Sequence, residues 1–454
     1  MEGFTGYEPM GIPAPSISKE TRRSIIERVR ENLRGMATTG ENAATPAAAE
    51  ERIRREVANV VARMRDVIGD LAPAELAALQ KEAADGFLRL GPLQPLQEDD
   101  SISEIMVNGG GMDADGNYYA PKVFVEVDGV ISPRPDIEIS SVAELEALIA
   151  RIGDRMGRRC DMANPRMDAS LPDGSRVNAT HRSISLDGPS LTIRKFRKDA
   201  MTPEELVDRG TCTDDMMMFL SSCIASRLNI FISGGTGSGK TTLLNVLSSF
   251  VPPAERIVSI EDTAELQLKQ PNIVRLQARP ANTEGRGAIT IHDLLVNALR
   301  MRPDRIIVGE CRSTETLEML QAMNTGHDGS LTTVHANSAR DAVTRIGTMA
   351  LQAEGNLTQA AIDAQIASAA QLIVHTSRYP SGARRIESIC SIEGYQEGRV
   401  VLQELFKWEG PDDPSRGRFA ATGFTSEKVR RKILGAGYMY RQEWFLAPDG
   451  RRGL

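Results

Sequence analysis

One loop of the sequence has the residue types and spacing that bind a nucleoside triphosphate. The segment SGGTGSGKTT contains G-x-x-x-x-G-K-[ST], with Gly234, Gly239, Lys240 and Thr241 at the fixed positions. Glycines there let backbone N–H groups wrap the β-phosphate, and the N-terminus of the following helix adds positive charge. The lysine bridges the β- and γ-phosphates, and the Thr241 hydroxyl is a ligand for Mg²⁺. The residues expected to bind the nucleotide are Gly234, Gly235, Thr236, Gly237, Ser238, Gly239, Lys240, Thr241 and Thr242.

Two apolar strands after this loop each end in acidic side chains. RIVSIEDTAEL delivers Glu261, with Asp262 after it, and RIIVGE delivers Glu310. In parallel α/β sheets ligands gather at the carboxyl ends of the strands, so we expect both tips to face the γ-phosphate. A carboxylate there can take a proton from water or orient it. We assign this role to Glu310, and a catalytic and Mg²⁺-binding role to Glu261.

Histidines and arginines are the next candidates. TGHDGSLTTVHANS holds two of the five histidines, His327 and His335, and no cysteine lies near them to complete a zinc site. A core or capping histidine is the structural alternative, but the strand between them enters the same sheet, so we expect nucleotide sensors. Three arginines upstream are candidates to pair with the γ-phosphate across a domain or subunit boundary, with surface ion pairs as the alternative. They are Arg176, Arg182 and Arg194.

The elements that must position these residues alternate between strand and helix from Asn229 to about Ile392, which is typical of a parallel α/β sheet. The region before them mixes strands with one amphipathic helix and is α+β in character. Helical patterns at Glu50–Ile68 and Pro73–Leu90 follow a linker-like segment, Gly35–Ala49. We predict a disordered tail over 1–18, a helical module with an internal linker over 19–95, an α+β domain over 96–200, and an ATPase domain with a C-terminal extension over 201–454.

Composition limits the function classes. The 454 residues are 41% apolar and 25% charged, as in a globular protein of two or three domains. A net charge of −7 argues against a protein that coats nucleic acid or anionic lipid. Five scattered cysteines indicate neither a disulfide framework nor a zinc ribbon. No segment is apolar for long enough to span a membrane, so we expect any membrane association to be peripheral.

Among proteins with such a loop, several classes lack support. The sequence has no N-K-x-D motif of GTPases, no LSGGQ-type signature, and no evident arginine-rich lid of a small-molecule kinase.

Four ordered segments carry a family resemblance: SGGTGSGKTT, SIEDTAEL, LRMRPDRIIVGE and MNTGHDGSLTTVHANS. Together they resemble the Walker A motif, aspartate box, atypical Walker B motif and histidine box of the secretion ATPases of type II, type IV pilus and type IV secretion systems. Segments further upstream, including GRRCDMANPRMDASLPDGSRVNA, are similar to the CpaF-like motors of tight-adherence (Flp) pilus assembly. The resemblance covers roughly Leu90 to Phe406.

The resemblance implies a cytoplasmic homo-hexamer that binds ATP and Mg²⁺ and works peripherally at the inner membrane on platform proteins of the pilus, without nucleic acid. Each subunit would hold a PAS-like α+β domain hinged to a RecA-like domain. Arg176, Arg194 and Arg182 would reach the phosphates, His335 and His327 would be the histidine-box residues, and Glu310 the general base. One departure is Cys311-Arg312-Ser313 after the Walker B strand, where Val-Arg-Gly is usual; Cys311 is small and apolar enough to replace valine.

The leading hypothesis is therefore a ring ATPase that powers pilus assembly, with retraction also open. A RecA-like nucleic-acid translocating or packaging ATPase is the rival, which DNA-stimulated turnover would favour. A nucleotide-gated scaffold that barely hydrolyses ATP is the third.

Overall fold

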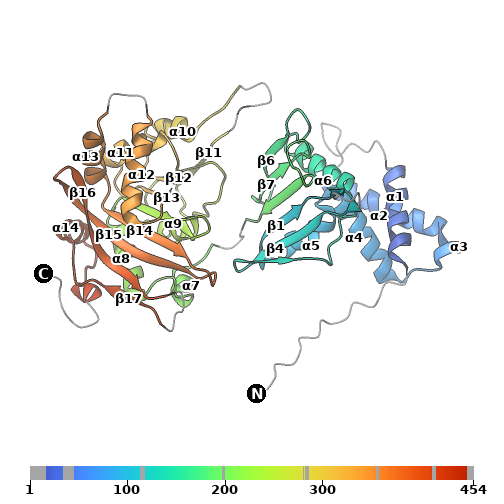
Figure 1. Cartoon of the computed structure of the whole chain (residues 1–454), viewed down its shortest axis with the longest axis horizontal. Coiled ribbons are helices and arrows are strands. Elements are labelled where there is room, and N and C mark those ends of the chain that lie inside the picture. Colours follow the sequence, from blue (N-terminus) through green and yellow to red (C-terminus); the bar gives the residue numbers. More distant parts are fainter. Residues whose placement is uncertain are drawn as a thin grey trace, which may run out of the picture. The chain divides into compact units, whose positions relative to one another are not determined.

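The computed structural model describes residues 17–33, 45–112, 118–196, 200–279, 281, 286–353, 357–411 and 416–446. The chain divides into two compact units, Met1–Phe196 and Arg197–Leu454 (Figure 1). This division lies four residues before the boundary predicted between 200 and 201, and the predicted domain bounds stay predictions. Within the described part of the chain, no helix combines the length and apolar character needed to cross a membrane.

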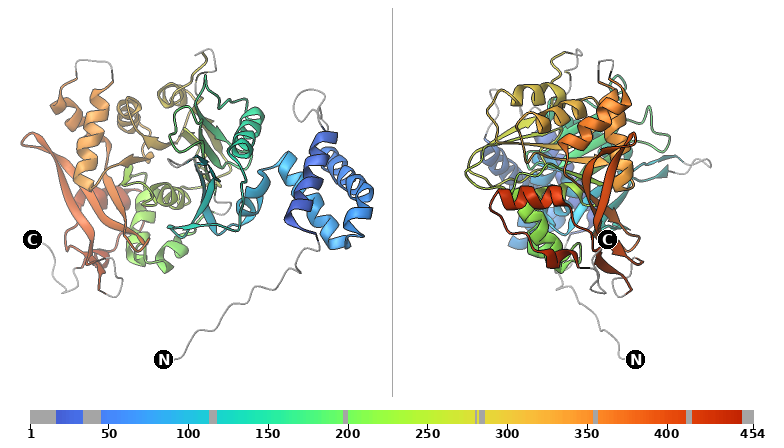
Figure 2. Two further views of the ribbon diagram at one scale, coloured as in Figure 1. Left: turned by 45° about the vertical axis from the view of Figure 1, so that its right-hand side comes forward. Right: turned by 90° about the vertical axis from the view of Figure 1, so that its left-hand side faces the viewer.

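The first unit begins with a helical module, whose members lie side by side in the blue part of Figure 2. Its helices are α1 (Lys19–Asn32), α2 (Pro46–Arg63), α3 (Arg65–Ile68) and α4 (Pro73–Leu88). Ile25 and Val29 of α1 meet Ile53 and Val57 of α2 in one buried cluster, because apolar residues three and four apart share a helix face. The module therefore has its own apolar core.

The structure differs from the prediction at two boundaries in this module: the end of the linker and the end of the N-terminal tail. The predicted linker extended to Ala49, but α2 already begins at Pro46, where Thr45 Oγ1 accepts a hydrogen bond from Ala48 N (3.3 Å) and proline suits the first helical position. Residues 1–16 of the predicted tail lie outside the described residues. Ile17 is 6% exposed and Ser18 is the N-cap of α1, so these two residues belong to the module.

The rest of the first unit is an antiparallel sheet with one long helix, α6 (Val142–Arg155). The sheet order is β5-β4-β1-β8-β7-β6. Alternating residues such as Ile105 and Val107 pack against Leu145 and Leu148 of α6. The elements are η1 (Gly91–Leu93), α5 (Gln94–Glu98), β1 (Ile102–Asn108), β2 (Gly111–Met112), β3 (Tyr118–Tyr119), β4 (Lys122–Val127), β5 (Val130–Pro133), β6 (Arg166–Ser170), β7 (Arg176–Thr180) and β8 (Ser190–Arg194).

The second unit is built on a nine-stranded sheet of order β11-β10-β12-β13-β9-β14-β15-β16-β17. The strands from β11 to β14 in this order run parallel, and β15, β16 and β17 are added antiparallel. Their bounds are β9 (Ile230–Gly234), β10 (Ile257–Glu261), β11 (Ile273–Gln277), β12 (Arg305–Cys311), β13 (Leu331–His335), β14 (Leu372–Arg378), β15 (Arg384–Gln396), β16 (Arg399–Glu409) and β17 (Arg418–Ala421). Strand β9 is buried throughout, as expected of a central strand covered on both faces.

Helices cover both faces of this sheet (Figure 1). One buried cluster joins the sheet to α8, α9 and α14, and the other joins it to α10, α11, α12 and α13. Their bounds are α7 (Pro203–Asp208), α8 (Asp214–Ala225), α9 (Lys240–Ser248), α10 (Ile291–Ala298), α11 (Glu315–Asn324), α12 (Ala339–Leu351), α13 (Gln359–Ala369), α14 (Glu427–Gly435) and η2 (Gln442–Phe445). The predicted fold class is confirmed: an α/β, RecA-like P-loop unit preceded by a PAS-like α+β part and a small helical module.

The C-terminal extension is polar in composition, yet part of it packs into the hydrophobic core of the second unit. Residues of η2 close the core beside α8: the ring centroids of Phe219 and Phe445 are 5.2 Å apart, and Phe406 of β16 lies 5.2 Å from Phe445. Trp444 is 4% exposed. The extension therefore completes the hydrophobic core of the second unit.

Candidate active site

The phosphate loop connects the end of β9 to the start of α9. Gly237 and Gly239 have φ values of +70° and +93°, which only glycine adopts easily. Lys240 is 8% exposed, and its Nζ donates to the carbonyl oxygens of Gly234 (3.1 Å) and Gly235 (2.8 Å). The lysine thus lies folded over the loop, where its charge is available to an anion that takes the place of these carbonyls.

The carboxyl ends of β9, β10, β12 and β13 form one edge of the sheet, which we call the phosphate-loop edge. Here His335 Nε2 lies 3.4 Å from Lys240 Nζ and 3.7 Å from Glu310 Oε1. Burial, reinforced by the charge of Lys240, holds the pKa of His335 below its ordinary value. The ring is therefore neutral at pH 7, and Nε2 can accept a hydrogen bond from the lysine. The predicted lysine, base and sensor side chains lie together.

Arg312 is a residue of this edge to which the sequence interpretation gave no role. Its guanidinium donates to Glu310 Oε2 (2.7 Å) and to Asp262 Oδ2 (3.2 Å), so it links the ends of β10 and β12. The hydrogen bond to Glu310 raises the pKa of Arg312. A basic residue two positions after the predicted base was the available signal, because side chains two positions apart in an extended chain point to the same side. Arg312 therefore supports the orientation that Glu310 has in this structure.

Glu261 is 5% exposed, and its carboxylate binds backbone amides of the loop that follows β10. Its Oε1 accepts hydrogen bonds from Glu265 N (2.8 Å) and Leu266 N (2.9 Å). A Cβ on Gly309 would stand 3.2 Å from Glu261 Cγ, so the glycine before Glu310 makes room for this side chain. Glu261 lies at the predicted edge, and its Oε1 stabilises the turn after β10.

The fit of this edge to Mg²⁺ follows from these contacts. Among the described residues there is no group of three or more His, Cys, Asp and Glu side chains that could hold a metal. Thr241, in the first turn of α9, offers a hydroxyl, and Mg²⁺ retains water and takes phosphate oxygens readily. The residues fit an ion that arrives with a nucleotide; they do not fit a metal held by protein groups alone.

Cys311, the departure in the Walker B-like segment, is 1% exposed. Burial raises the pKa of its thiol to about 12, so it is neither a thiolate nor a metal ligand at pH 7. Its Sγ lies 3.3 Å from Thr332 Oγ1 on the neighbouring strand. Cys311 is a packing residue, as the sequence indicated.

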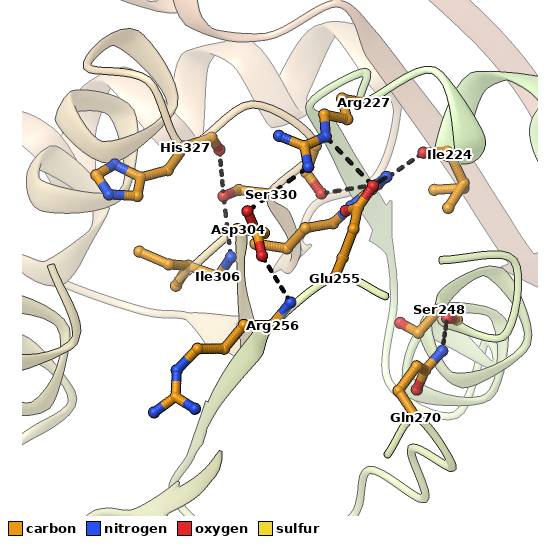
Figure 3. Close-up of polar contacts among 12 residues, drawn as sticks. Ile224, Arg227, Ser248, Glu255, Arg256, Gln270, Asp304, Ile306, His327 and Ser330 are labelled. Carbon is orange, nitrogen blue, oxygen red and sulfur yellow. Dashed lines mark hydrogen bonds and ion pairs between the residues drawn. The ribbon is translucent and has the colours of Figure 1, made fainter. Parts of the chain in front are cut away.

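The amino ends of β9, β10, β12 and β13 form the opposite edge, and His327 lies there (Figure 3). Its carbonyl accepts a hydrogen bond from Ser330 Oγ (2.7 Å), just before β13 begins. The structure therefore does not bring His327 to the phosphate loop: it precedes β13, whereas His335 ends it. This placement favours a structural role for His327 and leaves the proposed sensor role to His335.

The opposite edge is organised around Arg305, which is fully buried. Its guanidinium donates to Glu255 Oε2 (2.5 Å) and to the carbonyl oxygen of Ile224 (2.6 Å); Figure 3 labels the two acceptor residues. Arg227 donates to the other oxygen of Glu255 (3.3 Å). Asn229, also fully buried, accepts from Gly329 N (2.7 Å) and Ser330 N. These charges and amides are satisfied within the fold.

The three candidate arginines belong to the first unit. Arg176 of β7 and Arg194 of β8 are register partners, so they share one face of the sheet, and Arg194 Nε lies 3.8 Å from Glu104 Oε1. Arg182 forms a two-point ion pair with Glu146, with Nε 2.6 Å from Oε1. Their predicted contact with the phosphates stays a proposal.

Comparison with known proteins finds relatives whose names refer to secretion or conjugal transfer. Residues 91–406 match the family model described as type II/IV secretion system protein. A putative conjugal transfer protein of Mycobacterium tuberculosis (strain H37Rv) is 35% identical over 333 residues, 72% of this chain and 90% of that protein. The conjugal transfer protein TrbB of Rhizobium radiobacter is 33% identical over 317 residues, 69% of this chain and 90% of its own. The solved VirB11 ATPase of the Brucella suis type IV secretion system is 27% identical and covers 69% of this chain and 96% of its own, with a TM-score of 0.35.

Proposed function

The chain belongs to the type II/IV secretion system protein family, and from this premise we propose that it is an ATP-hydrolysing motor that powers assembly of a tight-adherence or type IV-like pilus. The observation that carries the enzymatic part is the convergence of Lys240, His335 and Glu310 at one edge of the sheet. In this proposal the chain works as a homo-hexamer on inner-membrane platform proteins and passes them the motion that hydrolysis drives.

The chemistry follows from the charges at the edge. Lys240 exchanges its hydrogen bonds to the Gly234 and Gly235 carbonyls for the β- and γ-phosphate oxygens. Thr241 would hold the Mg²⁺ that accompanies the nucleotide, with Glu261 as a further candidate, and the ion would neutralise charge on the phosphates. Glu310, oriented by Arg312, positions the attacking water or takes its proton.

Two groups complete the proposed site. Neutral His335 lies between Lys240 and Glu310, so it can report whether the lysine is engaged with a phosphate. Arg176 and Arg194, with Arg182, would approach the phosphates from the first unit and add positive charge in the transition state.

The test is ATP turnover by the purified full chain and by Lys240→Ala. We expect measurable turnover in the wild type, and in Lys240→Ala a loss of tight nucleotide binding. Lys407→Ala is the control, since Lys407 Nζ forms a surface ion pair with Glu409 (2.8 Å), and it should behave as wild type. Light scattering with nucleotide should give the mass of six chains. A wild type that binds ATP without turning it over would favour the scaffold and contradict the motor.

One observation favours a second candidate. Relatives at 33–35% identity are named conjugal transfer proteins, so a motor that acts on nucleic acid is the alternative. Turnover that DNA raises several-fold would support this alternative. Turnover that DNA leaves unchanged would support the pilus motor, as the net charge of −7 leads us to expect.

A further inference from the structure

A hairpin from the C-terminal half of the second unit lies against the phosphate loop. Strand β14 pairs in parallel with β9, with Thr376 opposite Gly234. The hairpin between β14 and β15 is closed by Tyr379 N to Ala383 O and Gly382 N to Tyr379 O, both 2.9 Å. This short turn places the end of β14 and the start of β15 beside the loop.

Arg384, the first residue of β15, contacts the loop directly. Its Nε donates to the carbonyl oxygen of Gly237 at 2.8 Å. A Cβ on Gly239 would stand 3.4 Å from Arg384 Cδ, and a Cβ on Gly237 would stand 3.1 Å from Nη1 of Arg378. The two arginines at the ends of the hairpin therefore converge on the tip of the loop.

The contact has a defined consequence for the neighbouring amide. In a trans peptide the C=O and the next N–H point in opposite directions. With the Gly237 oxygen held by Arg384, the Ser238 N–H therefore points away from Arg384, to the side of the Gly235 oxygen. There Ser238 N lies 3.5 Å from the Gly235 oxygen, which also accepts from Lys240. Arg384 thus fixes the direction of the Ser238 N–H, which lies close to the charged end of Lys240.

A second contact anchors the same residue. Ser238 Oγ lies 3.0 Å from Thr376 Oγ1 of β14, and each of the two residues is 2% exposed. Any side chain on Gly234 would come within 2.3 Å of the Thr376 oxygen. The hairpin therefore contacts the loop at Gly237 through Arg384 and at Ser238 through Thr376 of β14.

We propose that Arg384 is a positioning residue for nucleotide binding, which presets the phosphate loop through the Gly237 carbonyl. This inference rests on the proposed function, since it concerns the same loop. Because the loop amides surround the β-phosphate, ADP and ATP are held by this device equally, and the hydrolytic step at Glu310 does not depend on it.

The test compares Arg384→Met, which keeps the apolar stem but lacks the donor and charge, with wild type. We expect the Kd of ADP and of ATP to rise by the same factor, about tenfold for the loss of one charged hydrogen bond. KM should rise with it, while kcat at saturating ATP stays within about twofold. Arg384→Lys should recover part of the affinity and bind ADP about threefold more weakly than wild type.

Arg399→Ala is the matched control: it removes an exposed arginine of the same sheet that lies 3.6 Å from Glu397, and its ADP Kd should not change. A folded Arg384→Met with the wild-type Kd for ADP would overturn the proposal, and so would a fall in kcat with unchanged KM. Should Arg384→Met not fold, Arg384→Lys decides, and a wild-type Kd there overturns it. A wild type that binds neither ADP nor ATP overturns both this inference and the proposed function.

Discussion

The two edges of the central sheet hold similar residues in different states. At the opposite edge, Arg305 is fully buried and bound to Glu255, whose side chain is 12% exposed. At the phosphate-loop edge, Arg312 is 53% exposed and Glu310 20% exposed. Both are pairs of arginine and glutamate at strand ends. The first is shielded from solvent; the second is accessible to it and lies beside His335, which contacts Lys240.

The difference teaches how one sheet separates stability from chemistry. A buried ion pair is costly to break, since either partner is left uncompensated. A half-exposed pair exchanges partners at little cost, because water stabilises the intermediate. Groups that change partners during a reaction are therefore better suited to the half-exposed phosphate-loop edge. Four experiments can break or sharpen this contrast.

The largest effect is expected at Glu310. Glu310→Gln keeps the size of the side chain but removes the charge that orients or deprotonates water, so kcat should fall by about 10²–10⁴-fold. The ADP Kd and the Tm should change little, because the pair with Arg312 is half-exposed. Steady-state turnover with calorimetric binding measures both. Turnover at the wild-type rate would remove Glu310 from the mechanism.

The next effect is on stability, at Arg305. Arg305→Met leaves Glu255 buried without its main cation and should cost about 3–5 kcal/mol of unfolding free energy. The folded fraction should retain the ADP Kd, since the pair lies at the other edge. Urea unfolding measures the loss, and the double variant with Glu255→Leu should recover part of it. A weakened ADP Kd in folded protein would contradict the separation of the two edges.

The histidines give a smaller and more selective contrast. His335→Gln loses the ring beside Lys240 and Glu310, and kcat should fall about 10–100-fold, as for one hydrogen bond to a charged group. His327→Gln, at the opposite edge, should leave kcat within about twofold. Parallel assays of the two variants measure this directly. An equal fall in kcat in the two variants would support the predicted sensor role of His327.

The smallest effect is expected at Cys311. Cys311→Ala should cost about 1 kcal/mol through a small cavity and leave kcat within about twofold. Because burial holds the thiol protonated, with a pKa of about 12, iodoacetamide should not modify it in folded protein at pH 8. Mass spectrometry of the labelled protein is the measurement. Rapid labelling would show that this strand is open to solvent.

The sequence was sufficient where a motif and a strand direction agree. The phosphate loop lies between a buried strand and a helix as predicted. Glu261 and His335 end parallel strands and Glu310 is the last but one residue of another, so their meeting at one edge follows. His327 was misplaced although the same rule applies to it, since it precedes the strand that His335 ends. The strand between the two histidines does enter the same sheet, as predicted, but only His335 lies at its carboxyl end.

Other features had no local signal. Arg384 reaches Gly237 across 147 positions of sequence, a contact that depends on the antiparallel addition of β15 to the parallel sheet. The alternation of strand and helix was predicted to run to about Ile392, but the chain turns back on itself after β14. The aromatic residues that η2 buries lie in a polar tail, where spacing gave no period to follow.

Gly309 has a consequence for how this protein can vary. Because a Cβ there would press on Glu261 Cγ, the residue before the proposed base shares its space with a carboxylate 48 positions earlier. In a library randomised at both positions, alanine at 309 should survive selection mainly beside a shorter side chain at 261. A larger residue at 309 is therefore expected mainly together with a change at 261, although the two motifs look independent along the chain.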